Sequence, residues 1–257
     1  MKNIVRSLLD RSKTVATAIV PVLQGKSNQG YCYVCGKRTL FVEYGPALRD
    51  SYGCIRCQSR PRQRALMRVL EEQFPNWRSQ SVYESSPSGP CSAQIRKQCA
   101  QYDESQYFEN VPYGELKDGF RCENLESLSM PDDSYDLVIT QDVFEHVLNP
   151  KQAFREVARV LKPGGAHVFT VPIVTRGKSV ICAEDDGAGG ITYLKPPSYH
   201  RNPVDPNGSL VVTEWGDDLA EIIDESSGLS TEVILHKERA LGLDGRLLEV
   251  VVSKKPV

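Results

Sequence analysis

Four of the eight cysteines form two pairs with the same internal spacing. Two residues separate Cys32 from Cys35 and Cys54 from Cys57, and 18 residues lie between the pairs. Each pair can present two thiolates to one tetrahedral zinc ion, and the stretch between them is long enough for a β-hairpin that brings the pairs together. Four thiolate ligands leave no open coordination position. The spacing therefore predicts a structural zinc site.

Other chemistry fits these four cysteines less well. A disulfide is disfavoured in a chain that we expect to be cytoplasmic, where thiols stay reduced. A redox C-x-x-C motif would stand at the strand-to-helix turn of a thioredoxin-like unit, and neither pair does. The remaining cysteines lack ligand spacing and are interpreted as ordinary thiols: Cys91, Cys99, Cys122 and Cys182.

The most regular pattern of the chain runs from residue 131 to residue 172. Residues 135–140 form an apolar run that predicts a short strand. Asn149 is placed as a helix N-cap with Pro150 at the first helical position, and Gly164 and Gly165 end that helix. Residues 168–171 predict a second strand. A strand, a crossover helix and another strand make a βαβ unit of a parallel sheet, whose ligands bind beyond the carboxyl ends of the strands.

The amino-acid sequence of residues 131–172 resembles the central part of class I S-adenosylmethionine-dependent methyltransferases of type 11. The segments that carry the resemblance are DDSYDLVIT, QDVFEHV and RVLKPGGAHVFTVP. The resemblance implies an enzyme with an α/β fold, a Rossmann-like seven-stranded sheet and S-adenosylmethionine as cofactor. The sequence CIRCQSRPRQRALMRVLEE resembles the zinc ribbon that precedes this domain in some bacterial members. We therefore expect an N-terminal segment over 1–30, flexible or docking, a zinc-ribbon module with a connecting helix over 31–79, and a methyltransferase domain over 80–257.

The same resemblance suggests a cofactor site, although its loop departs from the family pattern. In the family, the loop after the first strand of the domain, which corresponds to residues 82–84 here, usually has an acidic residue and then a glycine-rich turn. Here Ser86 and Ser88 occupy glycine positions and only Gly89 is kept. Asp103 takes the place of the carboxylate that binds the ribose, and Asn124 that of the group that receives the adenine amine. The full set of expected cofactor residues is Glu84, Ser86, Ser88, Gly89, Asp103, Ser105, Asn124, Gln141 and Asp142. A purely structural role remains an alternative for each of them.

Three residues are candidates for contact with the acceptor. A base is needed only when the attacking atom carries a proton of high pKa. His146 follows the strand predicted at residues 135–140 closely enough to act there, and Tyr199 and His200 lie in a Pro-rich loop where relatives carry substrate-covering insertions. Structural roles are the alternative for all three.

Composition and charge limit the remaining possibilities. The chain has 257 residues, 25% of them charged and 40% hydrophobic, and no apolar run of membrane-spanning length. Residues 1–79 contain 14 Lys and Arg against 5 Asp and Glu, while the rest contains 17 against 28. We favour methyl transfer to a small-molecule or glycan-precursor acceptor. An RNA methyltransferase and a non-catalytic scaffold are the alternatives, the first suggested by the basic N-terminal part and the second by Ser86 and Ser88.

Overall fold

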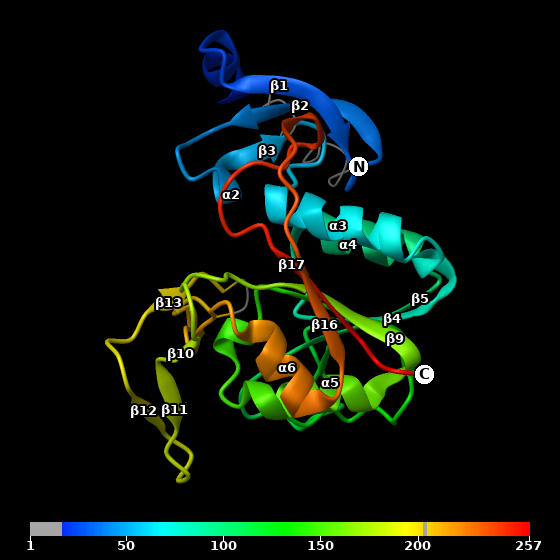
Figure 1. Cartoon of the computed structure of the whole chain (residues 1–257), viewed down its shortest axis with the longest axis vertical. Coiled ribbons are helices and arrows are strands. Elements are labelled where there is room, and N and C mark those ends of the chain that lie inside the picture. The colour runs from blue at the N-terminus through cyan, green and yellow to red at the C-terminus, as the bar shows by residue number, and fades with distance from the viewer. Residues whose placement is uncertain (1–16, 203–204) are drawn as a thin grey trace.

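The computed structural model describes residues 17–202 and 205–257. Figure 1 shows a small sheet at one end of the molecule and a large sheet flanked by helices below it. The small sheet contains β1 (Ser27–Cys32), β2 (Lys37–Glu43) and β3 (Tyr52–Cys54), paired antiparallel in that order. We call residues 27–60 the cysteine module. Its first strand begins inside the predicted N-terminal segment, and residues 1–16 of that segment lie outside the described residues.

The large sheet has the strand order β16-β17-β9-β8-β4-β5-β7-β6. Strand β17 is antiparallel to both neighbours and β6 is antiparallel to β7, whereas β9, β8, β4, β5 and β7 run parallel. This confirms the predicted Rossmann-like α/β sheet, with two-residue β6 as an eighth strand at one edge. The bounds are β4 (Ser81–Ser85), β5 (Gln101–Gln106), β6 (Leu116–Lys117), β7 (Phe120–Cys122), β8 (Tyr135–Gln141), β9 (Leu161–Thr170), β16 (Ser230–Ile234) and β17 (Val250–Lys254).

Helices cover both faces of this sheet (Figure 1). Helices α3 (Pro61–Gln73) and α4 (Gly89–Gln98) lie on one face, and α5 (Pro150–Val160) and α6 (Leu219–Ser227) on the other. Asn149 accepts a hydrogen bond from the Gln152 amide at the start of α5, as its N-cap position predicts. Gly228 ends α6 in the left-handed conformation, at a φ of 71°.

Side chains of the central strands alternate between two cores, as the two-residue period of a strand requires. On β17, Val250 and Val252 pack into one core while Val251 packs into the other. The first core contains α3 and also Phe41 and Cys54 of the cysteine module. The module therefore shares a continuous apolar interior with the large sheet.

Strands β16 and β17 pair antiparallel, yet no tight turn joins them at Asp244-Gly245, a dipeptide typical of hairpin turns. Residues 235–249 form a long excursion that contains the 3-10 helix η3 (Arg239–Leu241) and reaches the cysteine module. Asn28 donates to the Arg239 carbonyl at 2.6 Å, and Arg64 donates to the Gly242 carbonyl at 2.6 Å. The local sequence suggested a hairpin, but these contacts with residues far along the chain hold the connection open.

A second excursion, residues 172–218, separates β9 from α6. It contains three two-stranded ribbons made of β10 (Val180–Ile181) with β15 (Thr213–Glu214), β11 (Ala183–Asp185) with β12 (Ile191–Tyr193), and β13 (Tyr199–His200) with β14 (Ser209–Leu210). Among residues 17–202 and 205–257, no helix combines the length and the apolar character needed to span a bilayer.

Candidate functional site

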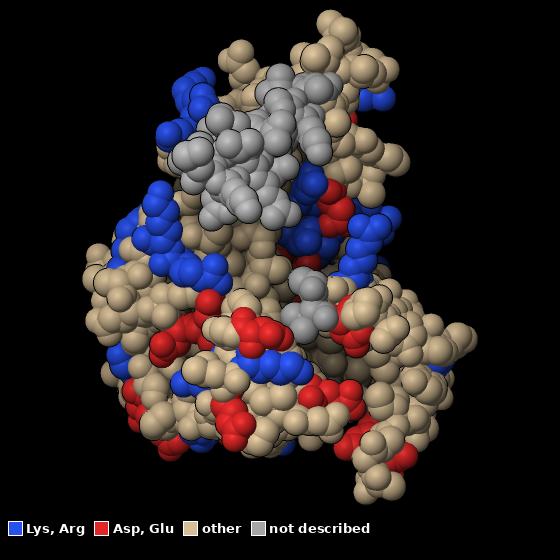
Figure 2. All heavy atoms as spheres, turned by 180° about the vertical axis from the view of Figure 1, so that it is seen from behind, with Lys and Arg blue, Asp and Glu red and all other residues tan. Residues whose placement is uncertain are grey.

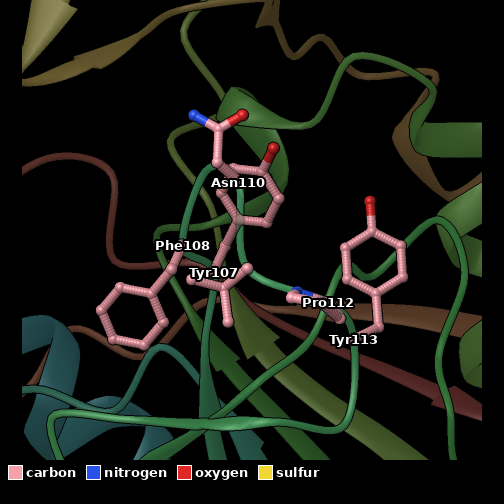
Figure 3. Close-up of a pocket in the computed structure, with 6 residues that line it drawn as sticks. Tyr107, Phe108, Asn110, Pro112 and Tyr113 are labelled. Atoms are coloured by element: carbon pink, nitrogen blue, oxygen red, sulfur yellow. The ribbon is translucent and has the colours of Figure 1, made fainter.

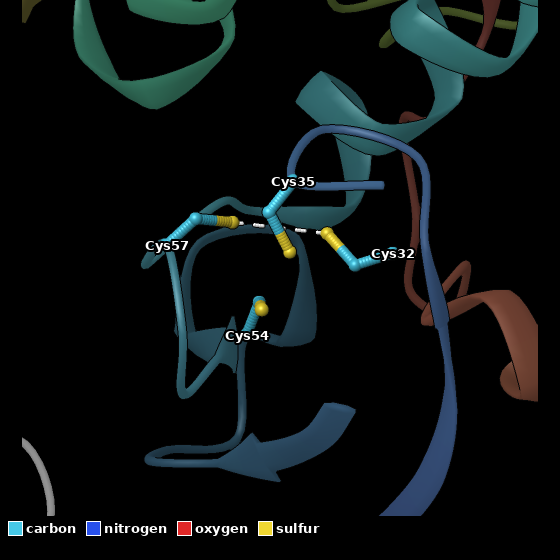
Figure 4. A group of neighbouring side chains, drawn as sticks. All are labelled: Cys32, Cys35, Cys54 and Cys57. Atoms are coloured by element: carbon cyan, nitrogen blue, oxygen red, sulfur yellow. Dashed lines mark hydrogen bonds between the residues drawn. The ribbon is translucent and has the colours of Figure 1, made fainter. Parts of the chain in front are cut away.

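The four cysteines of the two C-x2-C pairs come together at one end of the small sheet (Figure 4). Their Sγ atoms all lie within 4.8 Å of one another, and those of Cys32 and Cys57 are 3.7 Å apart. All four thiols are free. Zinc–sulfur bonds of about 2.3 Å in a tetrahedron place neighbouring sulfurs roughly 3.8 Å apart. The arrangement therefore fits the geometry of a four-thiolate metal site.

Local backbone turns present the thiols in the same way in both pairs. The Gly36 amide donates to the Cys32 carbonyl and the Gln58 amide to the Cys54 carbonyl, both at 2.8 Å. Gly36 and Gln58 both have a φ of 63°, a conformation that glycine adopts readily and a non-glycine residue adopts at a cost. A hydrogen bond with Cys35 is the largest of several influences that lower the pKa of Cys32 to about 7.

A cavity with a volume of about 1100 Å³ lies at the carboxyl edge of the parallel strands. Its walls come from the loop after β4, the end of β5, residues 123–126, residues 141–143 and 146–148 after β8, and residues 199–202, 205 and 208–210 of the second excursion. Arg49, Arg62 and Gln63 complete it from the side of the cysteine module and α3. This is the edge at which ligands of doubly wound sheets bind.

A smaller hollow of about 400 Å³ lies along residues 107–113. Figure 3 shows its lining, with the rings of Tyr107 and Tyr113 spread apart along the segment. Its lining contains no Lys, Arg, Asp, Glu or His. The larger cavity, where ionisable side chains gather, is therefore the candidate site.

Glu84 is the penultimate residue of β4, next to this cavity, but it is fully buried behind it. Its carboxylate accepts hydrogen bonds of 2.7 Å from Ser92, Gln141 and Tyr102. Burial raises the pKa of Glu84, and the three donors oppose that shift. Glu84 thus ties the start of α4 and the end of β8 to the strand between them.

The loop after Glu84 adopts the conformation expected of a glycine-rich turn, although serines occupy it. Ser86 has a φ of 55°, a left-handed conformation that a non-glycine residue adopts at a cost, and Ser88 is the N-cap residue of α4. Gly89 has a φ of 73°, and a Cβ at this position would lie 2.7 Å from Nε2 of Gln63. A larger residue there would have to displace the Gln63 side chain and adopt a positive φ that favours glycine. Ser86 and Ser88 line the cavity.

Two of the predicted cofactor residues on β5 do not reach the cavity. Asp103 accepts a hydrogen bond of 2.8 Å from the Tyr135 hydroxyl, and Ser105 is fully buried 2.6 Å from the Tyr83 hydroxyl. Strand β5 continues to Gln106, so Gln106 and Tyr107 stand at its carboxyl end and line the cavity. The polar run 101–106 lacks the apolar pattern that would have located this strand end.

Asn124 and Gln141 both line the cavity as expected. The side-chain oxygen of Asn124 accepts from the Glu126 amide at 2.9 Å, and its amide group donates to the Tyr113 hydroxyl at 3.1 Å. Gln141 is oriented by its bond to Glu84 and by a second contact of 3.1 Å with Ser92. Both side chains are therefore held in place by neighbours.

Asp142 also lines the cavity, but two arginines of the N-terminal part occupy its carboxylate. Arg49 Nη2 lies 2.9 Å from one oxygen and Arg62 Nε 2.7 Å from the other. Burial raises the pKa of Asp142, yet the two guanidinium groups hold it below its ordinary value. Sequence reasoning missed Arg49, because nothing in its local sequence indicates a partner 93 residues away.

The predicted acceptor residues gather on the opposite wall. His146 ends the 3-10 helix η2 (Phe144–His146), and Tyr199 and His200 form β13 in the second excursion. The rings of His146 and His200 meet edge to face, with centroids 5.0 Å apart and planes at 90°. Glu145, which was not predicted, lies behind them and is only 2% exposed. The structure therefore brings His146, Tyr199 and His200 to one wall of the cavity.

Comparison with known proteins agrees with this architecture. Residues 88–169 match the family described as Methyltransferase domain. Dimethylglycine N-methyltransferase of Parasynechococcus marenigrum (strain WH8102) is 43% identical over 54 residues, which are 21% of this chain and 19% of that enzyme. The match thus spans about a fifth of that relative's length.

Solved structures with a similar fold include an S-adenosylmethionine-dependent methyltransferase from Mesorhizobium loti, at 16% identity and a TM-score of 0.47 over 74% of this chain and 98% of that one. Another is 1,6-didemethyltoxoflavin-N1-methyltransferase of Burkholderia thailandensis, at 15% identity and a TM-score of 0.46 over 76% of this chain and 79% of that one. The family match and the strand order lead to one conclusion: residues 88–169 of this chain match a methyltransferase domain, within a Rossmann-like α/β sheet.

Proposed function

We propose that this protein transfers a methyl group from S-adenosylmethionine to a small-molecule acceptor bound in the 1100 Å³ cavity. The observation that carries the proposal is the position of this cavity, which lies at the carboxyl edge of β4, β5 and β8 where the matched domain runs. When bound, S-adenosylmethionine supplies a methyl group on a positively charged sulfur that leaves as a neutral thioether. The protein has to hold both reactants in line and exclude water.

The residues of the cavity fit this cofactor. Ser86 and Ser88 line the cavity in the turn that leads into α4, whose first amide groups suit an anionic group of the cofactor. A side chain added at Gly89 would occupy the space between this turn and Gln63. Gln106 and Tyr107, at the end of β5, replace Asp103 in our proposal as the groups beside the ribose. Asn124 and Gln141 remain as proposed contacts, while Glu84 orients Gln141 and Asp142 orients two arginines.

The acceptor would occupy the wall formed by His146, Tyr199 and His200. All three residues line the cavity, and none of them belongs to the loop after β4 that we propose for the cofactor. Drug-sized ligands fill cavities of roughly 300–1000 Å³, so this cavity has room for the cofactor and a small partner. A glycan precursor falls within this class of acceptors, and in this proposal His146 and His200 contribute imidazole groups to the wall beside the acceptor.

A structural zinc ion in the cysteine module is part of the proposal. The four convergent Sγ atoms support it, and Thr39 and Ser59 place hydroxyl groups within 3.4 Å of Cys54 and Cys32. The zinc would hold β1, β3 and the two turns together. It would thereby fix the position from which Arg49 and Arg62 reach the cavity.

RNA is the second candidate acceptor, and the basic N-terminal part of the chain favours it. Figure 2 shows Lys and Arg side chains gathered over the upper part of one face, with most Asp and Glu side chains lower down. However, several of these arginines serve internal contacts. Arg62 pairs with Asp142, Arg64 is fully buried, and Arg68 pairs with Glu72 and Glu238. These three arginines are therefore engaged within the protein and are not free to bind phosphates.

Calorimetry with S-adenosylmethionine and S-adenosylhomocysteine tests the cofactor. We expect both to bind, and Gly89→Ala to weaken binding by about tenfold or more, which corresponds to about 1.4 kcal/mol. Gly187→Ala is the matched control, because Gly187 has a similar φ of 76° but nothing within 4 Å of an added Cβ. Absence of binding to the wild-type protein at millimolar cofactor would favour the scaffold reading.

Filter binding of total RNA across a salt series tests the second candidate. The variant should remove exposed charge without disturbing internal contacts, so we choose Lys26→Ala, Lys37→Ala and Arg38→Ala together; all three are exposed. We expect weak binding in both proteins at physiological salt. Tight, steeply salt-dependent binding that the triple variant loses would promote RNA to the acceptor.

A further inference from the structure

We infer that Glu145, His146 and His200 bind a divalent transition-metal ion at the acceptor wall of the cavity. This site is separate from the cysteine cluster. Metal binding by these three residues stands by itself, and only its role towards the acceptor rests on the proposed function.

The buried carboxylate of Glu145 is the first reason. Its side chain is 2% exposed, and in the described part of the chain neither of its oxygens has a hydrogen-bond partner. An unpaired carboxylate removed from water is costly, and buried charges are normally paired or bound to metals. A cation placed against Glu145 would remove this cost.

The positions of the two histidines supply the second reason. Nε2 of His146 and Nδ1 of His200 each lie 3.7 Å from Oε1 of Glu145. All three ligand atoms fall within 4.8 Å of one another. Metal bonds of about 2.0–2.2 Å place neighbouring ligand atoms roughly 3–3.6 Å apart. The two separations from Oε1 of Glu145 lie just beyond this range, so a small shift of each imidazole would bring its nitrogen to bonding distance of an ion held by Glu145.

A simple hydrogen-bonded ion pair fits the geometry less well. A separation of 3.7 Å between Glu145 and each imidazole nitrogen exceeds hydrogen-bonding distance. That space is too wide for a direct bond but suits a bridging ion.

The tautomer of His146 is also set for metal binding. Its Nδ1 lies 2.7 Å from the Leu210 carbonyl oxygen, which can only accept a hydrogen bond. Nδ1 therefore carries the proton, and Nε2 presents its lone pair towards Glu145. Metal-binding histidines commonly donate their second ring N–H to a backbone carbonyl in this way.

The donor set selects the class of metal. Two imidazoles and one carboxylate suit zinc, cobalt, iron and manganese, whereas magnesium and calcium prefer oxygen ligands alone. Three protein ligands leave coordination positions open. Because His146 and His200 line the cavity, those positions would face the acceptor. Acceptors with a hydroxyl or carbonyl oxygen next to the methylated atom are the class that such an ion would orient.

The test uses full-length protein that has first received one molar equivalent of zinc, which the four-thiolate site retains, so that added Co²⁺ reports on a second site. Calorimetry and elemental analysis should show about one Co²⁺ bound per chain in addition to zinc. His200→Ala and Glu145→Gln should each weaken Co²⁺ binding by about tenfold or more. His236→Ala is the control, since His236 lies outside the cluster, and it should bind Co²⁺ as wild type does.

Two outcomes would overturn the inference. One is the absence of Co²⁺ uptake by zinc-loaded wild-type protein at millimolar ion. The other is unchanged Co²⁺ affinity in His200→Ala, which alters a half-exposed side chain and should leave folding intact. Cofactor binding measured on the same samples separates the two proposals: cofactor binding without Co²⁺ uptake refutes only the metal site, and Co²⁺ uptake without cofactor binding refutes only the proposed function.

Discussion

Nε of Arg62 lies 2.7 Å from Oδ2 of Asp142, and this contact links the first turns of α3 to the residue that follows β8. Arg49 reaches the other oxygen of the same carboxylate from the cysteine module. A residue that the sequence placed beside the cofactor is therefore also the point at which the N-terminal part is attached to the cavity.

Removing the charge of Asp142 should loosen this attachment. Asp142→Asn keeps the shape of the side chain and tolerates the φ of 54°. We expect the free energy of unfolding to fall by about 1–3 kcal/mol in urea denaturation, since hydrogen bonds to two charged groups are weakened. Asp132→Asn is the control, because Asp132 also pairs with an arginine but is 72% exposed. Equal losses in the two variants would contradict a special role for Asp142.

Arg64 should be irreplaceable by lysine. Its guanidinium group is fully buried and donates to the carbonyls of Ser59, Tyr52 and Gly242. Desolvation lowers the pKa of Arg64 to about 10, so it stays charged at neutral pH. Lysine cannot reproduce the planar fork, and Arg64→Lys should cost about 3 kcal/mol or more by thermal or urea unfolding. Arg176→Lys, at a 96% exposed side chain, should change stability by less than about 0.5 kcal/mol.

Loss of one cysteine ligand should release zinc. Protein purified without chelator should contain about one zinc per chain on elemental analysis if the divalent site remains empty. Cys54→Ser should lose this zinc and melt at a lower temperature. Cys182→Ser changes a buried thiol outside the cluster and should keep its zinc. A fully folded Cys54→Ser protein with unchanged melting would count against a structural metal.

His167 should make the protein sensitive to acid. It is fully buried against Phe169, and desolvation lowers its pKa to about 3 from 6.5. The folded protein therefore keeps His167 neutral while the unfolded chain binds a proton below pH 6.5. Its contribution is complete above that pH and declines as pH falls towards 3, at up to about 1.4 kcal/mol per pH unit. His167→Gln should flatten the pH profile of urea unfolding in this window. Parallel profiles for the two proteins would refute the assignment.

Local patterns predicted the centre of the fold well. The apolar run at 135–140 became β8, and Asn149 caps the helix that follows. The C-x2-C spacing also sufficed to predict that the four cysteines converge. These features depend on residues close together in sequence, or on a spacing that has few other uses.

Features that depend on distant partners escaped prediction. Gln106, not Asp103, ends β5 at the cavity, because neighbouring strands and not local polarity decide how far that strand extends. The sequence did not indicate a role for Glu145, because its neighbour His200 comes from the second excursion, far along the chain. The domain boundaries proposed from sequence likewise stay a prediction, since residues 235–249 join the cysteine module to the opposite end of the chain.

The contact between Arg64 and Gly242 also has a consequence for biosynthesis. The two residues are 178 positions apart, so the cysteine module leaves the ribosome long before its partner exists. At about 5–20 residues per second, the interval is roughly 10–35 s. During that time Phe41 and the guanidinium group of Arg64 lack the cover that residues 238–243 provide in the finished protein. A nascent chain stalled before Gly242 should therefore expose this uncovered surface to chaperones. Once residues 238–243 have been synthesised and released, they should bury it.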